Sequence, residues 1–530
     1  MKFNSRRSNM SARNGMVATT QPLAAMVGLR ILMEGGNAVD AAVATAAALN
    51  VVEPMSTGIG GDVFALVWMD SEKRVRALNA SGRSSANASL DELVSQGLGA
   101  IPDQSPYSVN VPGAVSGWEA ILDAHGRMSL ADVLKPAIAY AEDGFPVSEV
   151  ISGAWETSGA RLGVGPAGGE LLIGGRAPKT GEIMRMPELA NTFRAVAEGG
   201  ADAFYRGDIA ERIAAFVQSQ GGWLTSDDFA AHTAEWVEPI STTYRGHTVW
   251  QCPPPSQGVN TLMALNLAEG FDLNAMGFQS VDAYHHLIEC IRLAFADGLH
   301  HVTDPDHMSV AVSSLLSNRY AGSRRAEIRA DLAIAEVGPG LVPAHPDTVY
   351  LNCVDGDGNA CSFINSLFMG FGSGLVVPGT GIALHNRGAS FSLDPNHANA
   401  LAPNKRPFHT LIPGLVTQDG EFEMVYGVMG AMQQAQGHLQ VLVNMIDHGL
   451  SPQEALDAPR FSVRLGDGVY VEDIANPSIV NGLKSKGHPA LNRTPHQGFF
   501  GSGQIIRRDS ESGALTGASE PRADGAAVGW

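Results

Sequence analysis

The chain has 530 residues, 44% of them hydrophobic and 17% charged, which is typical of a globular protein that can bury a large core. Its net charge of −19, from 35 basic and 54 acidic residues, leaves no basic footprint for nucleic acid or an anionic membrane surface. The four cysteines, Cys252, Cys290, Cys353 and Cys361, have neither CxxC spacing nor disulfide-scaffold density, so we expect buried, reduced thiols.

The N-terminal segment predicts strands and helices rather than a targeting signal. The basic tail, residues 1–14, has no apolar stretch behind its charges, and the longest apolar run, 41–52, is too short to span a bilayer, so we expect a cytoplasmic protein. Residues 15–54 predict a strand and two helices, the second Ala-rich enough to be buried on all sides. A glycine turn and apolar strand follow at 56–70, and 74–83 is the expected partner strand.

The remaining elements change from helices to strands along the chain. Residues 115–300 are mostly helical by hydrophobic period, with breaks such as the turn CPPPSQG at 252–258. From residue 348 strands dominate, interrupted by a helix-like segment at 436–450. Helices dominate early in the chain and strands late, without the regular strand–helix alternation of a doubly wound sheet. This order predicts a layered α/β sandwich.

Two motifs match the patterns of a dinucleotide site and a metal site. GVGPAGG at 163–169 matches GxGxxG but does not stand between a strand and a helix, so we expect no dinucleotide or other cofactor. His285 and Glu289, and again Asp297 and His301, have the i, i+4 spacing of metal-ligand pairs on a helix. The pairs are more than two turns apart and no HExxH occurs, so a hydrogen-bonded helix face is the favoured interpretation and a metal-dependent hydrolase the alternative.

The junction between residues 338 and 363 is unusual. GPGLVPAHPD at 338–347 has three prolines and two glycines and predicts an exposed linker, whereas TVYLNCVD at 348–355 alternates as a half-buried strand. An ordinary loop-to-strand junction is one interpretation. The other is a cleavage site between Asp347 and Thr348 that makes Thr348 a new N-terminus.

Cleavage would turn Thr348 into a self-sufficient nucleophile. A threonine hydroxyl needs an adjacent base, and a freed α-amine, with an unperturbed pKa of about 7.7–8.0, can serve as that base. The β-branch of threonine restricts χ1 and so aims the hydroxyl. The glycine-containing turn YGVMGAMQQ at 426–434, between a predicted strand and a predicted helix, can offer backbone N–H groups to a developing oxyanion.

A series of motifs carries a resemblance to the γ-glutamyltranspeptidase family. In family order they are GGNAVDAAVA (35–44), VVEP…GIGGDVF (51–64), VPGAVSGW (111–118), PPPSQG (253–258), VDGDGNACS (354–362), FGSG (371–374), TGIALHN (380–386), PNKRP (403–407) and APRF (458–461). The resemblance covers about residues 15–530. It implies an N-terminal-nucleophile hydrolase of the α+β class, with a four-layer αββα sandwich and no cofactor or metal.

The resemblance also implies how the chain is divided. Autocatalytic cleavage would give a helix-rich large subunit, 1–347, and a small subunit, 348–530, that together form one structural domain; whether two such heterodimers pair is left open. Thr348 aligns with the family nucleophile, and Ser366 falls where the family has a threonine that hydrogen-bonds it. Gly430 and Ala431 fall on the paired glycines of the oxyanion hole.

The positions that bind the γ-glutamyl head group in the family differ here. The arginine that grips the α-carboxylate is replaced by Ser81, with Arg83 two residues further on. The acid that holds the α-amino group is replaced by Ser390, and a nearby glutamine by Arg387.

Three further substitutions lie at the same site by resemblance. A Ser-Ser pair is replaced by His409 and Thr410, and an asparagine by Phe368. Losing a carboxylate and gaining a guanidinium disfavours an ammonium group and favours an uncharged or anionic acyl group.

We therefore expect hydrolysis of a small carboxylate-bearing amide, as in the oxamate amidohydrolase and acylase branch of the family. Arg83 and Arg387 are the candidate carboxylate clamps. A γ-glutamyl hydrolase or transferase acting on glutathione-type substrates is the alternative, and the metal-dependent hydrolase remains a third.

Overall fold

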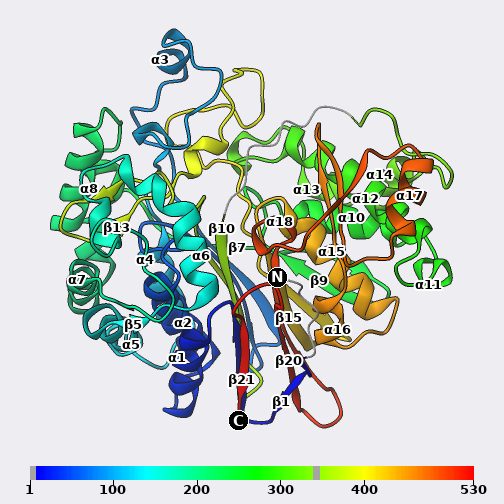
Figure 1. Ribbon diagram of the computed structural model, residues 1–530, viewed down its shortest axis with the longest axis horizontal. Coiled ribbons are helices and arrows are strands. Elements are labelled where there is room, and N and C mark those ends of the chain that lie inside the picture. Colours follow the sequence, from blue (N-terminus) through cyan, green and yellow to red (C-terminus); the bar gives the residue numbers. More distant parts are fainter. Residues whose placement is uncertain (1–6, 338–346) are drawn as a thin grey trace.

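The structure is a computed structural model that describes residues 7–337 and 347–530 (Figure 1). Within these ranges, two seven-stranded antiparallel sheets face each other, and helices cover the outer face of each. Helices α1–α8 lie on one side of the molecule and α10–α17 on the other. This is a four-layer αββα sandwich, as expected. The predicted linker at 338–346 lies outside the described residues.

Sheet I contains the strand that begins at the predicted cleavage site. Its strands, in spatial order, are β21 (Ala526–Gly529), β2 (Gly15–Thr19), β10 (Asp347–Asp355), β11 (Ala360–Phe368), β3 (Asp62–Met69), β4 (Arg74–Ala80) and β7 (Glu235–Val237). The strands β10 and β11, which follow residue 346, lie between β2 and β3, which precede it. Residues on both sides of the predicted cleavage site therefore build one sheet.

Sheet II lies against sheet I. Its strands, in spatial order, are β1 (Met10–Ala12), β20 (Leu515–Ser519), β19 (Ser502–Arg508), β15 (Glu421–Met429), β14 (Gly414–Gln418), β9 (His247–Gln251) and β8 (Ile240–Tyr244). Period-two alternation separates the two faces of each strand. Val349 and Leu351 of β10 contact the helices, whereas Tyr350 and Val354 pack between the sheets.

The longer helices pack against the two sheets or against one another. The longer ones over sheet I are α1 (Pro22–Met33), α2 (Ala38–Val52), α4 (Ala114–His125), α5 (Leu130–Asp143), α7 (Pro187–Tyr205) and α8 (Asp208–Ser219). Those over sheet II are α10 (Gly258–Ala268), α12 (Val281–His301), α15 (Gln433–Ile446), α16 (Pro452–Asp457) and α17 (Ser478–Ser485). Every residue of α2 is buried, as its Ala-rich sequence predicts, and Asn37 and Asp40 form a capping box at its start.

The smaller elements lie at the ends of the sandwich or in its connections. They are β5 (Phe145–Pro146), β6 (Ile183–Met184), β12 (Val376–Val377), β13 (Ile382–Ala383), β16 (Phe461–Arg464), β17 (Gly468–Glu472), β18 (Ala490–Arg493), α3 (Leu90–Ser95), α6 (Glu149–Ser158), α9 (Ser226–Ala230), α11 (Leu273–Met276), α13 (Val312–Leu315), α14 (Asn318–Arg325) and α18 (Gln497–Phe500). No described helix is long and apolar enough to cross a membrane.

One part of the sequence prediction was incomplete. Residues 115–300 were expected to be mostly helical, but β7, β8 and β9 lie within them and complete the edges of both sheets. These strands are short and only partly buried, so their alternation is hidden between longer helical periods. The four cysteines are buried and unpaired, as expected.

Candidate active site

Thr348 lies at an irregularity in the ladder between β10 and β11. Asp347 pairs with Phe368 and Val349 with Asn365, so Thr348 alone faces two residues of β11. Such a bulge redirects a side chain and interrupts regular pairing. The Thr348 side chain is fully buried, and its Oγ1 lies 2.9 Å from Oγ of Ser366.

Ser366 is itself held by the backbone that follows it. Its Oγ accepts a 2.8 Å hydrogen bond from the N–H of Phe368. Phe368 has a φ of +82°, a left-handed conformation that is strained for a bulky side chain and that clusters at functional sites. The strained turn therefore fixes the serine hydroxyl beside the threonine hydroxyl.

The turn that carries Gly430 and Ala431 joins β15 to α15, as the sequence predicts. Gly430 has a φ of +129° and Ala431 a φ of +54°. Gln257, from the CPPPSQG turn, donates from Nε2 to the carbonyl oxygens of Ala431, at 2.8 Å, and Thr410, at 2.9 Å. Its backbone N–H donates to the carbonyl oxygen of His409 at 2.8 Å. Sequence reasoning noted this motif but gave Gln257 no role.

A fully buried carboxylate, that of Asp62, lies on the same face of sheet I. Asp62 begins β3 and pairs with Ser366 of β11. Its Oδ1 accepts from the N–H of Gly82 at 3.0 Å, and its Oδ2 lies 3.1 Å from Nε2 of His409 and 3.5 Å from Nδ1 of His385. Sequence reasoning missed both Asp62 and His385; the acid at the end of GIGGD was the available signal.

Burial and neighbouring charges determine the protonation of the cluster formed by Asp62, His385, His409 and Arg387. Burial alone would raise the pKa of Asp62, but His385, the hydrogen bond from His409 and the charge of Arg387 together hold that pKa well below its usual range. Burial, with Arg387 nearby, lowers the pKa of His409 to about 3. Nδ1 of His409 accepts from the N–H of Leu411 at 3.3 Å, so the neutral ring donates from Nε2 to Asp62.

Arg387 is the cation of this cluster, and it has few partners. Its side chain is 1% exposed, and Nη1 donates to Oγ1 of Thr410 at 2.9 Å. Nε and Nη2 have no hydrogen-bond partner among the described residues, while the guanidinium carbon lies 4.0 Å from the centre of the Phe368 ring. Burial lowers the pKa of Arg387 to about 9, against the opposing effect of Asp62. Two unpartnered guanidinium nitrogens are donors of the kind that bind a planar anion such as a carboxylate.

The other predicted clamp, Arg83, has different partners. It contacts Asp304 at 2.9 Å, Glu235 at 3.5 Å and the carbonyl oxygen of Asn404 at 3.0 Å. None of these belongs to the Arg387 cluster. The two arginines therefore share none of these partners.

Ser81 and Ser390, which by resemblance replace residues that bind the γ-glutamyl head group, both have buried hydroxyls. Ser390 ends the short 3-10 turn Arg387–Ser390, and its Oγ has no partner among the described residues. Ser81 donates from its hydroxyl to Oδ1 of Asn79 at 2.7 Å. Neither residue offers a charge to a substrate.

The two candidate metal pairs on α12 have protein partners. His285 lies 2.7 Å from His488 and 2.6 Å from the carbonyl oxygen of Arg329. Glu289 pairs with Arg292 at 2.6 Å and Asp297 with Arg324 at 2.9 Å. Within residues 7–337 and 347–530, no group of three or more His, Cys, Asp or Glu side chains is placed to hold a metal ion.

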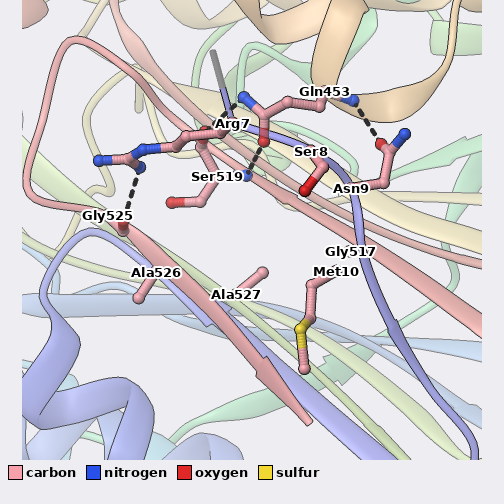
Figure 2. A pocket seen from close by; sticks show the side chains of 10 residues that line it. All are labelled: Arg7, Ser8, Asn9, Met10, Gln453, Gly517, Ser519, Gly525, Ala526 and Ala527. Carbon is pink, nitrogen blue, oxygen red and sulfur yellow. Dashed lines mark hydrogen bonds between the residues drawn. The ribbon is translucent and has the colours of Figure 1, made fainter. Parts of the chain in front are cut away.

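A cavity of about 420 Å³ lies away from these residues (Figure 2). The N-terminal segment and strands β20 and β21 line it. Arg7 donates there to the carbonyl oxygen of Gly525 at 2.8 Å, and Gln453 bonds to Ser519 and Asn9. None of the candidate catalytic or substrate-binding residues lines this cavity.

Comparisons with known proteins agree over nearly the whole chain. Residues 24–530 match the family model described as gamma-glutamyltranspeptidase. The "Glutathione hydrolase-like YwrD proenzyme" of Bacillus subtilis is 41% identical, over 97% of this chain and 98% of its own. The "Oxamate amidohydrolase proenzyme" of Klebsiella pneumoniae is 37% identical, over 99% of both chains. The crystal structure of cephalosporin acylase from Bacillus halodurans is 46% identical, with a TM-score of 0.94 over 99% of this chain and 97% of that one.

Proposed function

This chain belongs to the γ-glutamyltranspeptidase family, and we propose that it is a self-cleaving amide hydrolase whose nucleophile is Thr348. The observation that carries the proposal is the Thr348–Ser366 hydroxyl pair, 2.9 Å apart and buried at the irregular start of β10. The names of the relatives as proenzymes support cleavage of this chain as well.

Cleavage uses the same hydroxyl as turnover. Oγ1 of Thr348 attacks the carbonyl carbon of Asp347, the C–N bond breaks, and the proton passes to the nitrogen, which becomes the α-amine of Thr348. The ester that remains is then hydrolysed by water. The products are residues 1–347, ending in a carboxylate, and residues 348–530, beginning with a free threonine.

Turnover then repeats the chemistry on an external amide. The α-amine accepts the Oγ1 proton as the hydroxyl attacks the substrate carbonyl, and it returns that proton to the departing nitrogen. Water cleaves the resulting acyl ester. The turn at Gly430 and Ala431 is the proposed source of N–H donors for the negatively charged carbonyl oxygen.

The substrate class follows from Arg387. A buried guanidinium with two unpartnered nitrogens binds a carboxylate through charge-assisted hydrogen bonds, each contributing about 1.5–3 kcal/mol. Arg387 and the uncharged Ser390 both disfavour the ammonium of a γ-glutamyl group. We therefore propose a small amide whose acyl part bears a carboxylate. The relatives named as an oxamate amidohydrolase and a cephalosporin acylase support this class.

A γ-glutamyl hydrolase or transferase is the second candidate. The name of the 41% identical relative, glutathione hydrolase-like, favours it. It requires a partner for the substrate ammonium, and Asp62, the acid of this cluster, already accepts hydrogen bonds from Gly82 and His409.

The test begins with a denaturing gel and N-terminal sequencing of the purified protein. We expect two fragments, the smaller beginning Thr-Val-Tyr, and an uncut, inactive chain for Thr348→Ala. Oxamate and glutaryl-p-nitroanilide should be hydrolysed with higher kcat/KM than γ-glutamyl-p-nitroanilide.

A pair of arginine variants isolates the clamp. Arg387→Ala should raise KM for the carboxylate substrate at least tenfold, whereas Arg83→Ala, the matched control with its own acidic partners, should change it little. An active but uncut wild-type chain would refute the nucleophile. A preference for the glutamyl anilide that survives Arg387→Ala would refute the substrate class.

A further inference from the structure

The turn proposed to bind the oxyanion, at Gly430 and Ala431, packs against the short connection between α18 and β19. Gly430 directly follows β15 and Gly501 directly precedes β19, just beyond the last pair of the β15–β19 ladder, Met429 with Ser502. A Cβ atom on Gly430 would lie 3.1 Å from Cα of Gly501, and one on Gly501 would lie 2.6 Å from the carbonyl oxygen of Met429. The two glycines therefore pack backbone against backbone, so the position of one constrains the position of the other.

Arg460, in the APRF motif, holds the connection that carries Gly501. Its Nη1 donates to the carbonyl oxygens of Phe500, at 3.1 Å, and Gly501, at 3.0 Å, and its side chain is 1% exposed. The next residue, Phe461, accepts through its carbonyl oxygen a 3.0 Å hydrogen bond from Nε2 of Gln433, the first residue of α15. The motif therefore binds both the connection at Gly501 and the helix that follows the oxyanion turn.

A buried carboxylate fixes the direction of the Arg460 guanidinium. Nη2 of Arg460 donates to Oε2 of Glu520 at 2.9 Å, and the same oxygen accepts the N–H of Gly503 at 2.7 Å. Oε1 of Glu520 accepts from Nη1 of Arg522 at 2.7 Å. Because a guanidinium is planar and its donors point in fixed directions, a carboxylate bound to one nitrogen determines where the others point.

Stability alone does not account for these buried charges. The desolvation of a buried ion pair offsets most of its attraction, and apolar residues of similar volume often replace such a pair without loss of stability. Apolar side chains cannot supply directed donors to two adjacent carbonyl oxygens, as Arg460 does. The arrangement therefore fixes a position of the backbone.

We propose that Arg460 is a positioning residue, which holds Gly501 against Gly430 and so keeps the backbone N–H groups of the oxyanion turn aimed at the substrate carbonyl. This inference rests on the proposed function of Gly430 and Ala431. Arg460 supplies no group to the reaction itself and acts through two backbone segments. A small shift is enough, because a misplacement of about 1 Å can lower a rate about a hundredfold.

The experiment measures kcat and KM of the processed enzyme, and Tm, for variants of Arg460. The substrate is whichever of oxamate, glutaryl-p-nitroanilide and γ-glutamyl-p-nitroanilide the wild type hydrolyses fastest, so the result does not depend on the acyl group. Arg460→Lys keeps the charge but replaces the planar set of donors by one ammonium. It should lower kcat about tenfold or more, with KM within about threefold of wild type. Arg460→Gln makes the same test without a buried charge.

A glycine variant tests the contact between the two turns directly. Gly501→Ala places a methyl group 2.6 Å from the carbonyl oxygen of Met429 and should lower kcat in the same way. Gly513→Ala is its matched control, because Gly513 has a φ of +71°, close to the +80° of Gly501. A Cβ atom on Gly513 would lie 3.9 Å from its nearest neighbour, Nη2 of Arg508. This variant should carry a similar backbone strain and keep the wild-type kcat.

The control for the arginine variants is Arg325→Lys. Arg325 also donates to two adjacent backbone carbonyl oxygens, those of Asn266 and Leu267 near the end of α10. Its replacement removes the same kind of directed donors at a place that does not carry the oxyanion turn. Both kcat and KM should stay at their wild-type values.

The outcomes separate the positioning role from the proposed function. If the wild type stays uncut, or is inactive on all three amides, the proposed function fails. If the wild type is cut and active while a folded Arg460→Lys, Arg460→Gln or Gly501→Ala variant keeps the wild-type kcat, only the positioning role fails. A fall in kcat that Gly513→Ala and Arg325→Lys share, or an equal rise in KM, would also overturn that role, since a general structural defect would do the same.

Discussion

Removing the hydroxyl of Ser366 tests the geometry on which the proposed chemistry depends. Its Oγ forms a hydrogen bond with Oγ1 of Thr348 at 2.9 Å, and it accepts one from the N–H of Phe368 at 2.8 Å. In Ser366→Ala the buried N–H of Phe368 loses its acceptor, which costs about 1–3 kcal/mol. At roughly 2.1 cal/mol/K per residue this lowers Tm by about 1–3 °C for a chain of this length.

The functional loss should be larger than the loss of stability implies. Without its neighbour, the Thr348 hydroxyl is no longer aimed, and we expect kcat to fall about 10–100-fold, a barrier increase of about 1.4–2.8 kcal/mol, with KM within about threefold of wild type. Autocatalytic cleavage should slow in parallel, because it uses the same hydroxyl. A time course on a denaturing gel measures it without knowledge of the substrate.

Ser362→Ala is a matched control for this experiment. Ser362 lies on the same strand and face, and its Oγ also accepts a backbone N–H, from Gly414 at 3.0 Å, and contacts a hydroxyl, that of Tyr350 at 2.7 Å. It should lose comparable stability but keep cleavage and kcat. Ser366→Thr, which restores the family residue, should retain both. Wild-type cleavage and kcat in Ser366→Ala would refute the reasoning.

Four further outcomes are expected. The kcat/KM of the processed enzyme should fall at low pH with an apparent pKa one or two units below about 7.7–8.0, because burial favours the neutral α-amine of Thr348; a rate that stays flat down to pH 5 would exclude an amine base. Gln257→Leu should lower kcat about tenfold with little change in KM, since its bonds to the carbonyl oxygens of Ala431 and Thr410 hold the oxyanion turn; an unchanged kcat would remove that role. Burial lowers the pKa of His438 to about 3 from 6.5, so between these pH values the unfolded state binds a proton that the folded state does not. The free energy of unfolding should therefore fall by up to about 1.4 kcal/mol per pH unit as the pH drops below 6.5. Urea titrations of His438→Gln should show a smaller dependence on pH. Dialysis against a chelator should leave activity intact, and its loss would revive the metal-dependent alternative.

Much of the fold could be predicted from the sequence, because the hydrophobic periodicity of each segment is a local property of the chain. The Ala-rich helix α2, the strand pair β3–β4 and the strand-turn-helix at Gly430 were all expected, since each depends on residues close together in the chain. The strands β7 to β9 were missed, because short strands at or next to a sheet edge receive part of their stabilisation from neighbours far along the chain.

The sequence by itself determined which family the chain belongs to and where the proposed nucleophile lies, since ordered motifs and the junction at Thr348 are properties of the linear chain. Only the tertiary structure decided which arginine has guanidinium nitrogens without a hydrogen-bond partner. Arg83 and Arg387 are the same residue type beside equally suggestive motifs, yet one forms ion pairs and the other is buried with unpartnered nitrogens. Likewise, Asp62 lies 347 positions from His409, its hydrogen-bond partner. Periodicity tells which face of a strand a residue occupies, but not which side chains from distant segments meet it there.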